Sequence, residues 1–268
     1  MHGSFIVNSA NNQNELNLFY EKYSKDFSDL ALYYKISNFA ALSTKDKISA
    51  LAHKLKKEQR FSFASFLFDK LFTTFMSIEA LANKIECLIS MNKFENALQL
   101  NNIAFELFLE TEISDNTDNI EKALAYQKAK IYFLSANFAQ CLSVCENYII
   151  KSRQKRFFTL LCATLIALGN FEDAKKLLKR FHNQLYNFLA EALIHMHSIN
   201  QINTFIDFIK SIETSKINNE QSFIANIETL ISEPDNIRAT EKLLKQEIIF
   251  SGNTNKPTLI TETVQCKE

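Results

Sequence analysis

Apolar residues recur every three or four positions over most of this chain, which is the spacing of the buried side of an α-helix. The clearest stretch covers residues 157–181, where one amphipathic helix turns at Leu168-Gly169-Asn170 and a second helix runs back along it. The pattern therefore predicts a helical hairpin, in which two antiparallel helices are joined by a short turn.

The same hairpin pattern returns five times along the sequence. It covers residues 48–71, 81–104, 125–148, 158–181 and, more weakly, 186–209. In four of the hairpins the second helix opens on an aromatic residue: Phe61, Phe94, Phe138 and Phe171. These aromatic residues are 33, 44 and 33 positions apart, so the longer interval predicts a polar insertion, placed around residues 110–119.

This repetition resembles the tetratricopeptide repeat, a 34-residue helical hairpin. Alanines of the pattern stand where helices must approach closely: Ala52, Ala64, Ala97, Ala129, Ala174 and Ala190. The resemblance is best over residues 45–182, although the family's tryptophan is missing and Lys84, Asn101 and Lys128 replace residues that are usually apolar. It implies an all-α fold, a right-handed α-solenoid with capping helices at both ends.

The chain divides into three segments by this interpretation. Residues 1–12 are polar and predicted to be flexible, residues 13–250 form the solenoid, and residues 251–268 form a disordered tail. Ser43, followed by Asp46, predicts the N-terminal cap of the first clear hairpin. The fifth hairpin is less regular, because its apparent turn residue Ile199 follows Phe171 by only 28 positions.

Composition agrees with the helical pattern and removes several classes of function. Three glycines and two prolines in 268 residues disfavour sheets joined by tight turns, and they leave no glycine-rich loop for a nucleotide phosphate. The formal net charge is zero, which gives no overall preference for nucleic acid. Neither a signal peptide nor a long apolar run occurs, and the five irregularly spaced cysteines fit a reducing compartment, so we expect a cytoplasmic protein without a membrane span.

Candidate catalytic and metal-binding residues are few. Cys141 and Cys145 share one helical side, but both occupy core positions of the repeat and no further ligands accompany them. His195 and His197 are two positions apart on a helix, so they point in different directions and cannot bind one ion together. We therefore expect no enzyme activity, no metal and no cofactor.

The resemblance implies that the first helix of each hairpin lines a concave groove, in which partners lie as extended peptides or helices. The residues carried over to that groove are Asn83, Tyr126, Lys130, Phe133, Leu160, Ala163, Ile166, Phe188, Glu191 and His195. Of the clamp with which some members hold acidic chaperone tails, only Asn83 matches. The groove becomes apolar in the later hairpins, which suits an amphipathic helix; the alternative is that C-terminal helices fill it.

Charge is uneven along the chain. Residues 79–121 carry a net charge of −7, whereas residues 151–180 carry +6. The basic stretch could contact RNA or an acidic partner through Arg153, Lys155, Arg156, Lys175, Lys179 and Arg180. The leading hypothesis is a protein-binding adaptor or chaperone that can belong to a larger assembly. The alternative is a nucleic-acid or regulatory binding module that uses this basic stretch.

Overall fold

The computed structural model describes residues 9–110, 117–152, 154–179 and 185–211, and this part of the chain is helical without a strand. The chain divides into two compact units, residues 1–157 and 158–268, each of which is described by itself. The predicted all-α fold is therefore confirmed. The C-terminal capping helices, the tail and the core of the insertion lie outside the described residues.

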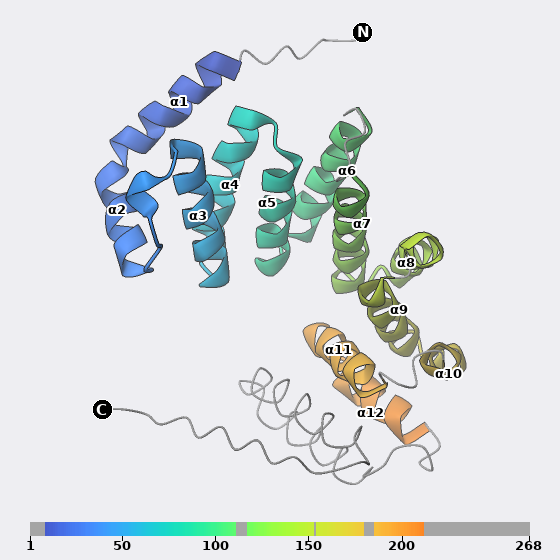
Figure 1. Ribbon diagram of the computed structural model, residues 1–268. Helices are drawn as coiled ribbons and strands as arrows, with labels where there is room; N and C mark the ends of the chain where they lie inside the picture. The colour runs from blue at the N-terminus through green and yellow to red at the C-terminus, as the bar shows by residue number, and fades with distance from the viewer. Residues whose placement is uncertain (1–8, 111–116, 153, 180–184, 212–268) are drawn as a thin grey trace, which may run out of the picture. The chain divides into compact units, whose positions relative to one another are not determined.

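The helices follow the predicted hairpins closely (Figure 1). Before the first predicted hairpin lie α1 (Ser9–Lys22), α2 (Ser24–Tyr33) and a short 3-10 helix, η1 (Phe39–Ala41). The hairpins are α3 (Thr44–Lys57) with α4 (Phe61–Phe75), α5 (Ile78–Ser90) with α6 (Phe94–Glu110), α7 (Thr117–Leu134) with α8 (Phe138–Ser152), α9 (Lys155–Ala167) with α10 (Phe171–Lys179), and α11 (Leu185–Ser198) with α12 (Ile202–Ser211).

Two sequence-based boundaries were wrong. Helix α1 already begins at Ser9, so residues 9–12 are helical rather than a flexible extension. The second helix of the last hairpin begins at Ile202, three positions after the predicted turn residue Ile199. Ile199 and Ile202 are both apolar, and neither is aromatic, so periodicity alone could not place the turn of the last hairpin.

Every predicted hairpin turns through the same backbone geometry. The residue two positions before each second helix has a positive φ, between 57° and 72°: Gln59, Asn92, Ala136, Gly169 and Asn200. The next residue donates its N–H to a carbonyl five positions back, at 2.8 to 3.0 Å: Arg60 to Leu55, Lys93 to Leu88, Asn137 to Tyr132, Asn170 to Leu165 and Gln201 to Met196. This is the Schellman motif, and it closes the C-terminal end of each first helix.

In the first unit each hairpin helix packs on the next one in the chain. Helix α4 contacts α1, α3 and α5, and α5 also contacts α7, so the first helices of the second and third hairpins lie side by side. The alanines at the contacts are fully buried: Ala52, Ala64, Ala97, Ala104, Ala125 and Ala129. Small side chains let the helix backbones approach closely, which is what the sequence pattern required.

The three polar departures from the repeat pattern each join two helices. Asn101 is fully buried and donates from Nδ2 to the Leu124 carbonyl at 3.0 Å, which links α6 to α7. The Lys84 Nζ lies 2.6 Å from Asp69 Oδ1, and the Lys128 Nζ donates to Asn102 Oδ1 at 2.9 Å. The Leu124 carbonyl satisfies the buried Asn101 donor, whereas the buried Asn101 Oδ1 accepts no hydrogen bond from the described residues.

The second unit contains the two smaller hairpins. Ala174 is fully buried on α10, as the repeat pattern predicted. The Phe171 ring, at the start of α10, lies edge-on to Phe208 of α12, with ring centroids 5.5 Å apart. Helices α11 and α12 pack directly on each other. Aromatic contacts thus connect the fourth hairpin to the fifth.

Candidate partner-binding surface

The apolar half of the predicted groove is buried in the structure. Five of its residues are fully buried, with no exposed side-chain surface: Phe133, Leu160, Ala163, Ile166 and Phe188. Such side chains cannot touch a partner in this conformation. The burial is visible on α9, where every residue from 157 to 164 is buried, so all sides of this stretch of the helix are covered.

The other predicted groove residues remain partly accessible. Asn83 on α5 and Tyr126 and Lys130 on α7 are half-buried in the first unit. Glu191 and His195 are half-buried on α11, in the second unit. Asn83 and Tyr126 belong to a set of polar side chains that the sequence analysis recognised only in part.

Lys56 of α3 connects the first hairpin to the second. Its ammonium donates to Asn83 Oδ1 at 2.6 Å and lies 2.5 Å from Glu86 Oε2, both on α5. Asn83 is fixed further by a bond from its Nδ2 to the Glu79 carbonyl, at 2.9 Å. Charge-assisted hydrogen bonds of this kind hold both partners in one geometry. The Glu86 side chain is 51% exposed, so a partner can still reach it from solvent.

Gln127 of α7 extends the same connection to the third hairpin. It is 5% exposed and donates from Nε2 to the Ala82 carbonyl of α5 at 3.0 Å. A second, longer contact of 3.4 Å joins the same nitrogen to Glu86 Oε1. Glu86 is therefore in contact with both Lys56 and Gln127, one from each neighbouring hairpin.

Arg156, at the start of α9, completes the set within the first unit. Its guanidinium carbon lies 4.9 Å from the centre of the Tyr126 ring and 5.7 Å from that of Phe157, and its Nε donates to Gln154 Oε1 at 2.9 Å. Burial lowers the pKa of Arg156, while Tyr126 and Glu86 act in the opposite direction. We call Lys56, Asn83, Glu86, Tyr126, Gln127 and Arg156 the polar row.

The predicted basic patch is less open than its composition suggests. Arg156 is packed on aromatic rings, Lys155 is half-buried, and the Lys175 Nζ lies 3.0 Å from Glu172 Oε1. Arg153, Arg180 and the side chain of Lys179 lie outside the described residues. Lys155 and Arg156 belong to the first unit and Lys175 to the second, so the structure does not establish one continuous patch.

Burial suppresses the chemistry of the four cysteines that the structure describes. Cys141 and Cys145 are both fully buried, and their mutual hydrogen bond, with burial, raises the pKa of the Cys145 thiol. Burial raises the pKa of Cys87 to about 11 and that of Cys162 to about 12. Thiols that stay protonated are poor nucleophiles and poor metal ligands. Among the described residues, no group of three or more His, Cys, Asp or Glu side chains could hold a metal ion.

Lys56, Glu86 and Gln127 are the members of the polar row that sequence reasoning did not select. Lys56 and Glu86 are 30 positions apart, close to one repeat period, so the repeat itself places them on neighbouring first helices. Opposite charges one period apart were the available signal. Across the described helices, none is both long and apolar enough to cross a membrane.

Comparison with known proteins adds little to this description. No protein-family model matches the chain, and no curated protein does. A chain in the solved structure of Naa15/Naa10 bound to HypK-THB is similar over 93% of this chain, with 14% identity and a TM-score of 0.33. The match covers 40% of that chain's own length. A likeness of this degree supports no conclusion about function.

Proposed function

We propose that the protein is a scaffold that binds a segment of another protein along the polar row, in the manner of an adaptor or chaperone. The observation that carries the proposal is that three successive hairpins contribute to one hydrogen-bonded set of polar side chains, in which Gln127 is buried and Lys56, Asn83 and Glu86 remain accessible. Groups that are already held in place lose little freedom on binding, so they can select a partner at low entropic cost. The resemblance to tetratricopeptide repeats supports this proposal, because in that family the first helix of each hairpin lines the partner-binding groove.

The row favours a polar or charged segment over a purely apolar helix. Lys56 and Arg156 are cationic, Glu86 is anionic, and Asn83 and Gln127 carry amides, so the row offers both donors and acceptors. The apolar side chains once expected in the groove are buried and are not available for this contact. An extended peptide that matches this order of charges is the partner class that fits best.

The test is site-specific photo-crosslinking in extract of the native host. A benzoylphenylalanine replaces Glu86, which is exposed on the first helix α5, and in a matched control it replaces Glu106, which is exposed on the neighbouring second helix α6. Cross-linked proteins are identified by mass spectrometry. We expect a specific product from position 86 and not from position 106.

A second arm tests the charges themselves. The Lys56→Gln, Glu86→Gln double variant leaves polar side chains at both positions but removes both charges of the 2.5 Å pair. We expect its affinity for the identified partner to fall, with circular dichroism showing an unchanged helix content. Products from position 106 alone, or undiminished affinity of the double variant, would show that the partner binds elsewhere.

No observation favours the nucleic-acid alternative. Three residues of the basic stretch are held by a ring or by an acid: Arg156 lies on Tyr126, the Lys175 Nζ lies 3.0 Å from Glu172 Oε1, and the Lys176 Nζ lies 2.8 Å from Asp173 Oδ1. Binding to RNA stays a prediction of the sequence, and its test is salt-dependent binding that is lost on reversing the charge of Arg156.

A further inference from the structure

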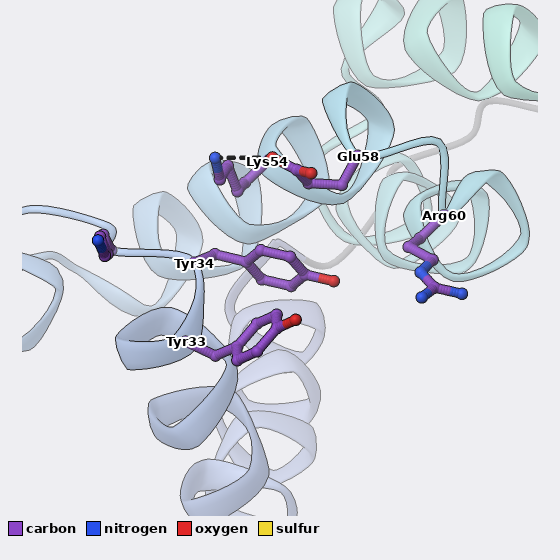
Figure 2. A pocket seen from close by; sticks show the side chains of 6 residues that line it. Tyr33, Tyr34, Lys54, Glu58 and Arg60 are labelled. Atoms are coloured by element: carbon purple, nitrogen blue, oxygen red, sulfur yellow. Dashed lines mark ion pairs between the residues drawn. The ribbon is translucent and has the colours of Figure 1, made fainter. Parts of the chain in front are cut away.

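A pocket of about 350 Å³ lies in the first unit, between the C-terminal ends of α2 and α3 (Figure 2). Tyr33, Tyr34 and Lys35 line it from the end of α2. Lys54, Glu58 and Arg60 line it from the end of α3. No residue of the polar row contributes to this pocket, so its chemistry is independent of the function proposed above.

Both walls of the pocket are fixed by backbone hydrogen bonds. On the α2 side Lys35 has a φ of 54°, and its N–H donates to the Leu32 carbonyl at 3.0 Å. On the α3 side Arg60 donates its N–H to the Leu55 carbonyl at 2.9 Å, directly after the left-handed Gln59. The side chains therefore start from rigid helix caps, which is the arrangement that a preorganised binding site needs.

The charges of the pocket do not cancel. Lys54 and Glu58 form an ion pair with a nitrogen–oxygen distance of 2.9 Å, drawn in Figure 2. This leaves Lys35 and Arg60, and within the described part of the chain neither side chain has an acidic partner. The helix C-termini add partial negative charge, which Lys57 in the last turn of α3 helps to offset. The lining thus carries an excess of two positive charges.

Two hydroxyl groups accompany the free guanidinium. The Tyr33 and Tyr34 rings meet edge-on with centroids 4.9 Å apart, and Figure 2 shows their hydroxyls extending toward the side on which Arg60 lies. Among the described residues, neither hydroxyl has a hydrogen-bond partner. The Tyr33 side chain is 76% exposed, so the edge of the pocket presents an open aromatic ring.

We propose that this pocket binds a phosphate monoester. A guanidinium presents parallel N–H groups that match two phosphate oxygens, and the two phenol hydroxyls can donate to the third. An excess of two positive charges matches the phosphate dianion better than a singly charged carboxylate. The volume of about 350 Å³ exceeds a phosphate alone and leaves room for the group that carries it, with the open Tyr33 ring as its contact.

The test is isothermal titration of the full chain with phenyl phosphate, inorganic phosphate, and a five-residue phosphoserine peptide with its unphosphorylated form. We expect phenyl phosphate to bind and Arg60→Gln to weaken it at least about tenfold, because charge-assisted bonds are lost. Arg60→Lys keeps the positive charge but loses the paired N–H groups of the guanidinium, so its affinity for phenyl phosphate should lie between those of Arg60→Gln and the unchanged protein. Tyr33→Phe with Tyr34→Phe keeps both rings and should lose affinity severalfold.

The matched control is Lys93→Gln. Lys93 occupies the same turn position in the next hairpin, is exposed, and lines no pocket described here, so its loss should leave binding unchanged. Tighter binding of the phosphopeptide than of phenyl phosphate would identify a modified protein side chain as the source, and the reverse would identify a small phosphate ester. Tighter binding of inorganic phosphate than of both would overturn the assignment to a monoester. No heat of binding at millimolar phenyl phosphate, or equal loss in Arg60→Gln and Lys93→Gln, would overturn the proposal.

Discussion

The five equivalent turns allow a sharp test of what fixes the hairpins. All five residues at the left-handed position have φ between 57° and 72°, yet only Gly169 is a glycine. A residue with a Cβ costs roughly 1–2 kcal/mol in this conformation relative to the right-handed one. We therefore predict that Ala136→Gly stabilises the first unit, although glycine is usually a destabilising residue in a helical protein.

The size of the effect follows from two opposing terms. Ala136 is exposed and its N–H donates to the Phe133 carbonyl at 3.0 Å, so glycine keeps the hydrogen bond and loses no packing. Relief of the left-handed strain contributes about 1–2 kcal/mol, and the extra freedom of glycine in the unfolded chain removes about 0.4–1 kcal/mol. The net gain should be about 1 kcal/mol. Asn92→Gly should gain less, because asparagine tolerates this conformation.

The matched control is Ala139→Gly, the same chemical change three positions later. Ala139 is exposed and is the second residue of α8, where glycine costs up to about 1 kcal/mol relative to alanine. Urea unfolding followed by circular dichroism should move the midpoints of the two variants in opposite directions with an unchanged slope. Equal destabilisation of both variants would refute the reasoning, because it would show that the turn residue bears no backbone strain.

Two further predictions concern the core and the pH response. Ala174→Asp should lower the free energy of unfolding by several kcal/mol, because it places a charge at a fully buried helix contact. Glu172→Ala, on the exposed side of the same helix, should change it by no more than about 0.5 kcal/mol. Thermal unfolding of both variants checks this, and matching unfolding curves would contradict it. Burial, with Lys56, lowers the pKa of His53 below its ordinary 6.5, so the folded state binds this proton less readily than the unfolded chain, and stability should fall as the pH drops below about 6.5. His53→Gln should remove this part of the pH dependence in urea titrations at pH 7 and pH 5.5, and an unchanged pH dependence would count against it.

The hairpins could be predicted because their turns combine a period with a conspicuous residue. Phe61, Phe94, Phe138 and Phe171 are each the first residue of a second helix, so one aromatic residue per repeat located four boundaries. The last hairpin had no such residue, and its boundary was misplaced at Ile199. The 3.6-residue period gives the direction of an apolar side but not the position at which the chain turns.

The binding surface was harder to predict for a different reason. The spacing of Phe133, Leu160 and Ile166 shows that they lie on apolar sides of their helices. It does not show how many neighbouring elements cover those helices. The structure buries all three completely. Half of the polar row was missed because Lys56 and Glu86 acquire their meaning only from each other, across a repeat period that has to be known before the pair can be seen.

The polar departures from the repeat have a role that apolar residues could not fill. Apolar contacts are tolerant of sliding, because burial depends on area rather than direction, whereas a hydrogen bond holds only in a narrow range of geometry. The bond from Asn101 to the Leu124 carbonyl requires one register of α6 against α7, and the Lys84–Asp69 pair requires one register of α4 against α5. Lys56 and Gln127 act in the same way between first helices, with Glu86 as their shared partner. In a chain whose turns are built largely without glycine, these bonds fix the register of neighbouring helices, and the same fixed side chains then offer a partner a surface of defined geometry.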